Sequence, residues 1–507
     1  MGFNWKQLQN GSDIRGVALT GIAGQEVNLN ADIVAKLGKA FYHWLSQKNE
    51  GIDQLKIAVG MDSRLSGPEL KEAFINALVQ SGAEVYDCGM ASTPAMFMTT
   101  VTAPYNTHGG VMLTASHLPF NRNGLKFFTP KGGLEKQDIT DILQIAETGS
   151  FEPAKKEGSF CELDFIDIYS NLLVEKIRKE VNSKDNYEQP LSGFKMTVDA
   201  GNGAGGFYAH KVLEVLGADV SSSQFLDPDG KFPNHVPNPE DAIAMKSICD
   251  AVKEHKTDIG IIFDTDVDRA AIVNHKGQPI NRNELVALSA VIVNEEHPGA
   301  TVVTDSITSD GLGWFINDVL KAKHHRFKRG YKNVINEAIR LNEAGEESWL
   351  AIETSGHAAL KENYFLDDGA YLVTKFIIKM ARLKEEGKTL TSLIEQLPVP
   401  AESKEFRINI TNSDFKAYGE RVISELGHLA ASKSAWELVP NNYEGVRVSV
   451  NKNNFKGWFL LRLSLHDPVI PLNIESDTEG GVESIAQELV EFFNNFTELD
   501  LKSLINR

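Results

Sequence analysis

Short apolar runs alternate with longer amphipathic stretches along most of this chain. Residues 55–60 form an apolar run that ends in glycine, a pattern typical of a buried strand. In residues 68–81, which follow, Leu70, Phe74 and Leu78 are spaced to share one face of a helix. This order of strand, polar turn and helix predicts α/β layers with mainly parallel sheets.

The same pattern returns further along the chain. Strand-like runs that each precede a polar or glycine-containing turn occupy residues 84–89, 109–113, 196–199, 259–263 and 300–304. A polar, glycine-containing stretch at residues 149–158 suits a linker. The recurrence predicts three similarly built α/β domains with mixed sheets, which cover residues 1–157, 158–274 and 275–397.

The pattern changes after two closely spaced prolines, Pro398 and Pro400, which favour an extended connector. Residues 445–464 alternate between apolar and polar positions, as strands with one exposed face do. Residues 481–496 then have the spacing of a helix. We therefore expect residues 398–507 to form a fourth domain, of α+β type with an antiparallel sheet.

The composition is that of a globular protein and narrows the classes of partner. The 507 residues are 42% hydrophobic and 24% charged, and a net charge of −18 argues against binding to nucleic acid or to an anionic membrane. The three cysteines are widely scattered, which predicts neither a metal site nor a disulfide framework. No apolar run is long enough to span a membrane and none opens the chain, so we expect a cytoplasmic protein.

A serine, a histidine and a lysine lie close together after the strand predicted at residues 109–113. Ser116 and His117 end that run in a turn, and Lys126 lies one loop further on. A serine in such a turn is expected to present its hydroxyl rather than pack it, so Ser116 suits receiving and giving up a group. Taken alone, the segment is better explained as an ordinary polar turn after a strand.

Three carboxylates at alternate positions follow the strand predicted at residues 259–263. Asp264, Asp266 and Asp268 in one tight turn can converge on a cation, and all-oxygen ligands favour Mg²⁺, with Ca²⁺ and Mn²⁺ as alternatives. Magnesium keeps coordination positions for phosphate oxygens, so the turn indicates phosphoryl chemistry, and Arg269 adds a positive charge beside it. A solvated acidic turn is the alternative.

Residues 353–357, with the sequence ETSGH, place an acid, a hydroxyl and an imidazole on one loop. Glu353 and Ser355 suit hydrogen bonds to adjacent sugar hydroxyls, and His357 can move a proton near neutral pH. A capped loop with a surface histidine is the alternative.

Two further segments are predicted to be structural. The glycines of residues 199–206 lack the spacing of a dinucleotide site and predict a tight turn from a strand into a helix. Asp62 and Arg64 are expected to contact each other and hold their own loop.

Taken together, these motifs resemble those of the α-D-phosphohexomutase superfamily, in particular its phosphomannomutase/phosphoglucomutase branch. The likeness follows the family's order through an N-terminal arginine loop, a phosphoserine loop, an N-G-x-K segment, a metal loop and a sugar loop, at residues 12–16, 114–119, 123–126, 264–269 and 353–357. The resemblance implies four domains around a central cleft. It also implies reversible conversion between hexose 1-phosphate and hexose 6-phosphate, with mannose, glucose or both as the sugar.

The resemblance implies a role for each residue near the transferred group. Ser116 would carry the phosphoryl group, with hexose 1,6-bisphosphate as the intermediate and activator. Mg²⁺ would bind the three carboxylates of the metal loop and an oxygen of Ser116. Positive charge would come from Arg269 and Arg15, and His117 would help to position the phosphate. Protons would move through Lys126, through Arg15 and through the histidine of the sugar loop, His357.

Binding of the rest of the substrate is implied by two other loops. Glu353 and Ser355 would hold the sugar 3- and 4-hydroxyls, which are the same in glucose and mannose. The family's phosphate loop has the pattern R-x-S-G-T-E-P, and this chain has RLSLHDP at residues 462–468, with leucine in place of glycine. We expect Arg462, Ser464 and His466 to bind the substrate's other phosphate. Arg447 is a further candidate for that phosphate.

Three other functions compete with this interpretation. An amino-sugar phosphate mutase of the same fold would usually carry glutamine where this chain has Thr354. A non-catalytic sugar-phosphate-binding protein is supported only by the altered phosphate loop. A phosphatase would follow if a phosphoserine were open to water. The expected partners are phosphorylated hexoses, and the expected assembly is a monomer or a homodimer.

Overall fold

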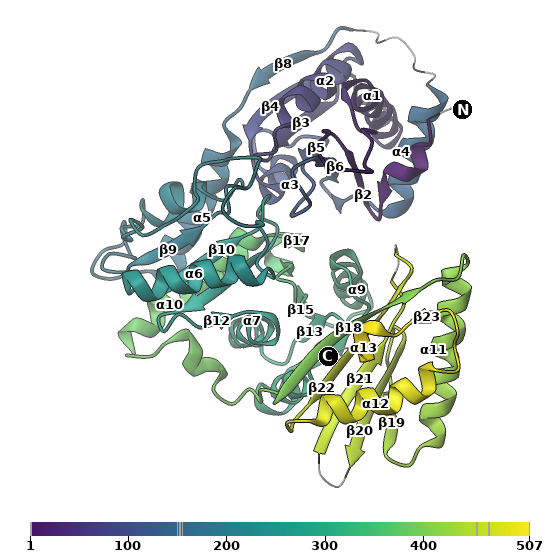
Figure 1. Ribbon diagram of the computed structural model, residues 1–507. Coiled ribbons are helices and arrows are strands. Elements are labelled where there is room, and N and C mark those ends of the chain that lie inside the picture. Colours follow the sequence, from purple (N-terminus) through teal and green to yellow (C-terminus); the bar gives the residue numbers. More distant parts are fainter. Residues whose placement is uncertain are drawn as a thin grey trace. The chain divides into compact units, whose positions relative to one another are not determined.

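The computed structural model describes residues 3–149, 151, 154, 156–452, 455–464 and 467–505. The chain divides into two compact units, one formed by Met1–Asn281 with Ser355–Ser392 and the other by Arg282–Thr354 with Leu393–Arg507 (Figure 1). The predicted linker at residues 149–158 falls partly outside the described residues. Among the described residues, no helix has both the length and the apolar character needed to cross a membrane.

The first sheet of the first unit follows the order β1-β2-β6-β5-β3-β4-β8, and β7 pairs with β6. Its strands are β1 (Gln9–Asn10), β2 (Asp13–Val17), β3 (Lys56–Met61), β4 (Glu84–Met90), β5 (Gly109–Leu113), β6 (Arg122–Thr129), β7 (Gly132–Gly133) and β8 (Ser159–Glu162). The pairs β3–β4, β3–β5 and β4–β8 are parallel, and β6 runs antiparallel to β5 and β2. Because β3 and β5 are parallel neighbours, the loops after them meet at one edge of the sheet.

Helices cover both faces of this sheet. They are α1 (Ala31–Lys48), α2 (Gly67–Gln80), α3 (Thr93–Val101), α4 (Lys136–Thr148) and α5 (Phe165–Val181), after the 3₁₀ helix η1 (Trp5–Leu8). α1, α2 and α4 share one apolar core with the sheet, whereas α3 packs on β5 and β6. A Cβ on Gly109 would lie 3.0 Å from Phe41 of α1, and a Cβ on Gly110 would lie 2.3 Å from the Met96 carbonyl of α3. The two adjacent glycines therefore let a helix approach β5 closely from each side.

The second sheet of the first unit follows the order β12-β11-β10-β9. Its strands are β9 (Met196–Asp199), β10 (Ile259–Phe263), β11 (Ala270–Asn274) and β12 (Pro279–Ile280). β9 and β10 are parallel, and β11 is antiparallel to β10 and β12. The hairpin of β10 and β11 holds residues 264–269 in its turn.

Helices and a short hairpin complete the first unit. They are the π-helix η2 (Tyr208–Leu213), α6 (Ala242–His255), β16 (Ala358–Leu360), the 3₁₀ helix η4 (Lys361–Asn363), β17 (Leu366–Asp367) and α10 (Gly369–Glu385). α6 shares a core with β10 and β11, and α10 contacts those strands as well as α5. The predicted tight turn after β9 is present, with Gly201 at φ 52°.

The second unit contains a parallel sheet of order β14-β13-β15. Its elements are α7 (Arg282–Glu296), β13 (Thr301–Thr304), α8 (Asp310–Trp314), the π-helix η3 (Phe315–Val319), β14 (Lys323–Arg326), α9 (Tyr331–Glu343) and β15 (Ser348–Ile352). α9 packs on β13 and β15, and α7 contacts β15.

An antiparallel sheet of order β19-β20-β21-β22-β18-β23 forms the rest of the second unit, after the 3₁₀ helix η5 (Leu390–Ile394) near the boundary between the units. Its elements are β18 (Glu402–Ile410), α11 (Phe415–Ser432), β19 (Trp436–Leu438), β20 (Val446–Lys452), β21 (Phe455–Leu461), β22 (Val469–Ser476), α12 (Gly481–Phe493), β23 (Leu499–Asp500) and α13 (Lys502–Ile505). α11 and α12 share one core with the strands. The expected α/β class with mixed sheets, followed by an antiparallel α+β region, is confirmed.

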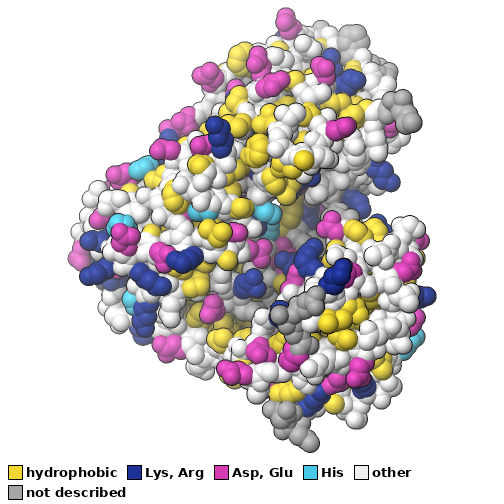
Figure 2. All heavy atoms as spheres, in the orientation of Figure 1, with side chains coloured by type: hydrophobic (Ala, Val, Ile, Leu, Met, Phe, Trp, Pro, Cys, Tyr) yellow, Lys and Arg dark blue, Asp and Glu magenta, His cyan; other side chains and the backbone are white. Residues whose placement is uncertain are grey.

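The surface carries charged side chains of both signs. On the face drawn in Figure 2, acidic side chains in magenta and basic side chains in dark blue are interspersed. Cys88, Cys161 and Cys249 are all free thiols, as their wide spacing predicted.

Candidate active site

Ser116 lies in the turn after β5, in the left-handed region with φ 52°. The expectation that its hydroxyl would be exposed is wrong, because only 4% of the residue is accessible to solvent. The hydroxyl donates to Asp264 Oδ2 at 3.1 Å and accepts from Arg269 Nη2, also at 3.1 Å. The turn between β10 and β11 thus covers Ser116 and supplies both of these partners.

Arg64 holds the backbone of the serine turn. Its Nη1 donates to the carbonyls of Pro119 and Arg122 at 2.9 Å each, and its Nη2 donates to those of Leu118, at 2.7 Å, and Ser116. Buried carbonyl groups need such donors, and one rigid guanidinium serves four of them. The turn's conformation at Ser116 therefore depends on Arg64.

The predicted contact between Asp62 and Arg64 is confirmed. Asp62 Oδ1 accepts from the Arg64 backbone N–H at 3.0 Å, and its Oδ2 lies 3.3 Å from Arg64 Nε. Burial raises the pKa of Asp62 to about 6, and the guanidinium beside it opposes that shift. The loop that this pair holds follows β3, the parallel neighbour of β5, which explains why Arg64 reaches the serine turn.

The three carboxylates after β10 converge. One ligand oxygen from each of Asp264, Asp266 and Asp268 lies within 4.8 Å of the other two, and all three residues are buried. Burial excludes the solvated acidic turn that was the alternative. Asp266 Oδ1 and Asp268 Oδ1 have no hydrogen-bond partner among the described residues. Burial, together with the charges of Asp268 and Asp266, raises the pKa of Asp264 well above its ordinary value. A bound cation would offset the repulsion between these three carboxylates.

Lys126 reaches the same carboxylates from β6. Its Nζ contacts Asp268 Oδ2 and lies 3.1 Å from Asp266 Oδ2. The residue is 5% exposed, so these ion pairs form away from bulk water. The sequence placed Lys126 near Ser116, and the structure adds that it touches the acidic turn.

His117 and Arg269 form a third part of the site. Arg269 Nη2 lies 2.6 Å from His117 Nδ1. Burial, and then the charge of Arg269, lowers the pKa of His117 to about 3. The imidazole is therefore neutral and accepts this hydrogen bond, which holds the guanidinium against the Ser116 hydroxyl.

His357 lies beside the acidic turn through a backbone bridge with Arg269. Its Nδ1 is 2.5 Å from Asp367 Oδ2 and 4.0 Å from Asp268 Oδ1. Burial alone would lower the pKa of His357, but the carboxylates of Asp367 and Asp268 outweigh it and raise that pKa to about 9. His357 is thus a partly buried cation, and its ion pairs with Asp367 and Asp268 do not fit the alternative of a free surface histidine.

Two contacts of the site were absent from the sequence analysis. Asp367 lies on β17, and the hairpin with β16 brings it beside His357. Thr93, at the start of α3, donates from Oγ1 to Asp266 Oδ2 at 2.5 Å, across 173 residues of sequence. A hairpin pattern in residues 358–367 was a usable signal for Asp367, but no local pattern connects Thr93 to the acidic turn.

Arg15 lies in β2 rather than in a loop. Its Nη2 is 3.0 Å from Asp13 Oδ2, and its backbone is opposite Gly124 of β6. Its charge is among those that lower the pKa of His117. Arg15 is therefore close to the serine turn even though its segment is a regular strand.

The sugar-loop residue Glu353 belongs to the second unit. Its Oε1 accepts from the Gly330 backbone N–H at 2.7 Å. Burial and the charge of Glu353 raise the pKa of Asp305 to about 7, and Thr354 Oγ1 donates to Asp305 Oδ2 at 2.8 Å. In the first unit, Ser355 Oγ is buried without a hydrogen-bond partner among the described residues. Such a hydroxyl is suited to bind a ligand.

Arg462, also in the second unit, shares one carboxylate with a second arginine. Arg462 Nη2 lies 4.0 Å from Glu405 Oε2, and Arg329 Nη1 lies 3.8 Å from the same oxygen. Burial and the charge of Arg329 lower the pKa of Arg462. Two neighbouring guanidiniums are suited to bind an anion such as phosphate, and the sequence analysis missed Arg329.

Of the other two residues predicted in the phosphate loop, the structure describes only Ser464. Ser464 Oγ accepts from the Asp467 backbone N–H at 3.3 Å, and the predicted ligand His466 lies outside the described residues. The suggestion that Arg447 serves this loop is wrong, because its guanidinium donates to the carbonyls of Ser306 and Thr308 instead.

Comparison with known proteins identifies the family to which this chain belongs. Models of α/β/α domains I, II and III of phosphoglucomutase/phosphomannomutase match residues 6–153, 171–277 and 281–400. The chain belongs to this family.

Relatives in the phosphoglucomutase/phosphomannomutase family match nearly the whole chain. A phosphoglucomutase of Neisseria meningitidis serogroup A is 30% identical over 476 residues, 93% of this chain and 94% of that protein. A phosphomannomutase/phosphoglucomutase of Pseudomonas syringae pv. tomato is 30% identical over 474 residues, 93% of this chain and 92% of that protein. The crystal structure of a phosphoglucomutase/phosphomannomutase family protein from Burkholderia thailandensis has a TM-score of 0.77 and 26% identity, with 96% of each chain covered.

Membership of the family assigns the class of reaction. The chain is a hexose phosphate mutase, and hence an isomerase. The amino-sugar mutase and the non-catalytic binding protein are not favoured, because relatives across more than nine-tenths of the chain carry phosphoglucomutase or phosphomannomutase names.

Proposed function

We propose that this mutase interconverts the 1-phosphate and 6-phosphate of glucose, mannose or both, and that Ser116 carries the phosphoryl group. The observation that carries the proposal is the Ser116 hydroxyl between Asp264 and Arg269, each at 3.1 Å. A nucleophilic oxygen beside a carboxylate cluster and a guanidinium is the arrangement that phosphoryl transfer requires.

The phosphoryl group moves in two steps in this proposal. The bond from phosphorus to Ser116 Oγ breaks as a bond to the sugar hydroxyl forms, which yields hexose 1,6-bisphosphate. The proton of the sugar hydroxyl passes to Lys126 or His357, whichever is in its deprotonated form. The bisphosphate then turns over, and the bond from its other phosphorus to the sugar oxygen breaks as a bond to Ser116 Oγ forms. The freed sugar oxygen takes the proton back, and the product leaves.

The acidic turn fits Mg²⁺ as the cofactor. Asp266 Oδ1 and Asp268 Oδ1 are buried oxygens without a hydrogen-bond partner among the described residues, and with Asp264 they form an all-oxygen ligand set. An oxygen of phosphorylated Ser116 would complete this set. When bound, the ion supplies positive charge that offsets the charge of the transferring group.

Fixed charges of the chain complement the metal. Arg269 is buried and contacts both the Ser116 hydroxyl and Asp264, so it stabilises negative charge on the transferring group without reorganising. His117 orients Arg269, and Arg15 adds a second guanidinium near the serine turn.

Substrate binding is assigned to the sugar and phosphate loops. Glu353 and Ser355 bind the sugar 3- and 4-hydroxyls, supported by the partnerless hydroxyl of Ser355. Arg462, Ser464 and His466 bind the phosphate that is not being transferred. Neither set distinguishes the C2 epimers glucose and mannose.

The proposed domain organisation keeps four domains, at residues 1–157, 158–274, 275–397 and 398–507. The ends of the family matches, at residues 153, 277 and 400, support these boundaries. We also propose a cytoplasmic protein that acts as a monomer or a homodimer, and three free thiols are consistent with a reducing compartment.

Coupled assays test the function directly. The protein with Mg²⁺ and a trace of glucose 1,6-bisphosphate is given glucose 1-phosphate, mannose 1-phosphate or glucosamine 6-phosphate. We expect turnover of glucose 1-phosphate, mannose 1-phosphate or both, and none in Ser116→Ala. Ser434→Ala, at an exposed serine, is the matched control and keeps full activity. Turnover of glucosamine 6-phosphate alone, or full activity of Ser116→Ala, contradicts the proposal.

A further inference from the structure

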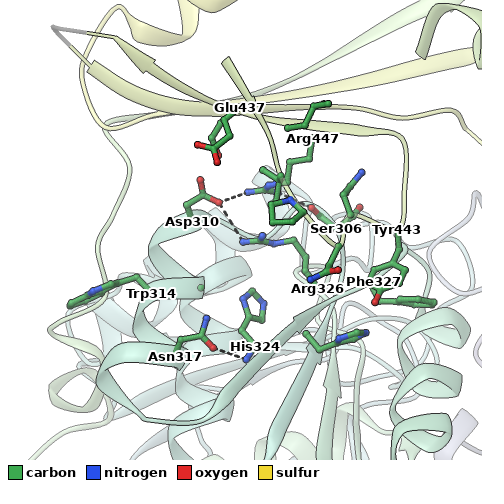
Figure 3. A pocket seen from close by; sticks show the side chains of 18 residues that line it. Ser306, Asp310, Trp314, Asn317, His324, Arg326, Phe327, Glu437, Tyr443 and Arg447 are labelled. Atoms are coloured by element: carbon green, nitrogen blue, oxygen red, sulfur yellow. Dashed lines mark hydrogen bonds and ion pairs between the residues drawn. The ribbon is translucent and has the colours of Figure 1, made fainter. Parts of the chain in front are cut away.

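A cavity of about 480 Å³ lies in the second unit, and none of the proposed catalytic or substrate-binding residues lines it (Figure 3). Its walls come from residues 306–327, which include α8 and β14, and from residues 437–449, which include the start of β20. The first segment lies inside the third family match and the second lies beyond it. The volume is in the range of small-molecule sites.

Two arginines in this cavity share the carboxylate of Asp310. Asp310 Oδ1 lies 2.8 Å from Arg447 Nη2 and 3.5 Å from Arg326 Nη2. Figure 3 shows the two guanidinium groups pointing toward Asp310. Arg447 also donates to two carbonyls and stacks on the Trp458 ring at 3.6 Å, so both of its Nη atoms are engaged by the protein.

Arg326 is the less compensated of the two cations. Its Nε donates to Thr308 Oγ1 at 2.9 Å and its Nη2 donates to the Ser309 carbonyl at 3.1 Å, both neutral groups. Burial and the charge of Arg447 lower the pKa of Arg326 to about 9. A guanidinium that is partly accessible from a cavity, with the carboxylate of its ion pair at 3.5 Å, is suited to bind an incoming anion.

The remaining walls offer surfaces for a ring and for hydroxyls. The rings of Phe327 and Tyr443 pack with centroids 4.9 Å apart, and Trp314 is 46% exposed. Asn317 and Glu437 also line the cavity and provide an amide and a carboxylate. An anionic group beside hydroxyls and a ring is the chemistry of a sugar phosphate.

We propose that this cavity is a second ligand site, which binds a phosphate monoester of a sugar. The phosphate would bind Arg326, and the ring of the ligand would lie against the aromatic side chains of Trp314, Phe327 and Tyr443. Free hexose phosphates and nucleoside monophosphates share this chemistry. Because the walls come from two segments of the chain, the bound ligand connects them and raises the stability of the second unit. The site is distinct from the residues that perform the mutase reaction, so it is suited to regulate them.

A local reporter separates this site from the catalytic one. The full chain is labelled with 5-fluorotryptophan, and the ¹⁹F resonance of Trp314 is identified from Trp314→Phe. Glucose 6-phosphate and adenosine 5′-monophosphate are titrated separately, with glucose as the uncharged control. We expect a saturable shift of the Trp314 resonance with at least one ester and none with glucose, and the tighter ester identifies the source of the ligand. No saturable shift with either ester overturns the proposal.

Two substitutions with opposite expected effects sharpen the test. Arg326→Gln should weaken binding reported by Trp314 by about tenfold or more, because it removes a charge-assisted pair. Asp310→Asn should strengthen binding, because it removes the carboxylate that competes with the ligand for Arg326. Arg421→Gln, on an exposed arginine of α11, is the matched control and leaves binding unchanged.

Either variant can contradict the proposal. Unchanged affinity in Arg326→Gln, or weaker binding in Asp310→Asn, overturns it. Circular dichroism establishes that each variant is folded. If Arg326→Gln does not fold, Asp310→Asn alone decides, because a merely structural role of Asp310 would not produce tighter binding.

Discussion

The Ser116 hydroxyl lies 3.1 Å from Asp264 Oδ2, although 148 residues of sequence separate the two. This contact joins the turn after β5 to the turn after β10 and brings a nucleophile to a cluster of carboxylates. It also explains why Ser116 is buried, since the second turn covers the first. The proposed chemistry of the mutase depends on this pair.

The acidic turn is expected to be essential for metal binding. Asp266→Asn should weaken Mg²⁺ binding and lower kcat/KM by about 100-fold or more, because it removes one of three converging charges. Isothermal titration of Mg²⁺ and the coupled assay measure the two effects. Asp250→Asn, on the exposed side of α6, is the matched control and should change neither. Normal Mg²⁺ affinity in Asp266→Asn would remove the metal role from this turn.

Arg64 is expected to act on catalysis by positioning the serine turn. Arg64→Gln should lower kcat by about 100-fold with little change in KM, because the four carbonyls lose their donor and Ser116 shifts. Arg64→Lys restores the charge without the fork of donors, so it should recover only a small part of kcat. Steady-state kinetics measure this split. A rise in KM at constant kcat would show that Arg64 affects substrate binding instead.

Asp367 is expected to set the protonation of His357. In the folded, metal-free protein Asp367→Asn should lower the pKa of His357 from about 9 toward its ordinary value, because the closest carboxylate is lost. Above the new pKa the imidazole is neutral, so the protonated form disappears at a lower pH than in the wild type. An NMR titration of the His357 ring measures the shift. An unchanged pKa would mean that Asp268 alone holds the charge.

Glu475 is expected to make the second unit less stable as pH rises. Burial raises its pKa to about 7 from an ordinary value of 4.5. Between these values the folded protein holds a proton that the unfolded chain releases, so stability falls as pH increases through this window and levels off above it. The loss is on the order of 3 kcal/mol.

The variant Glu475→Gln tests whether Glu475 causes this fall of stability with rising pH. The amide oxygen still accepts from Trp458 Nε1, which Glu475 binds at 2.8 Å, but the side chain no longer titrates. Urea unfolding at pH 5 and pH 8 should therefore differ less for Glu475→Gln than for the wild type. An equal difference in the two proteins would show that other groups cause the pH dependence.

The strands that lead to the site could be predicted from the sequence. The burial of Ser116 and the long-range contacts that hold the site could not. β9 and β10 were predicted to the residue, because each is an apolar run that ends at a polar turn. Convergence of the carboxylates followed from their alternate spacing in one turn. The burial of Ser116 and the contact from Thr93 depend on residues more than a hundred positions away, for which the local pattern carries no signal.

Phosphorylation of Ser116 is the step on which the proposed reaction depends, and mass spectrometry detects it. The wild type, Ser116→Ala and Ser434→Ala are incubated with Mg²⁺ and glucose 1,6-bisphosphate, and intact and peptide masses are recorded. We expect one added phosphoryl group on the wild type and on Ser434→Ala, located on Ser116, and none on Ser116→Ala. A phosphoryl group on another residue, or turnover by a wild type that never carries one on Ser116, would contradict it.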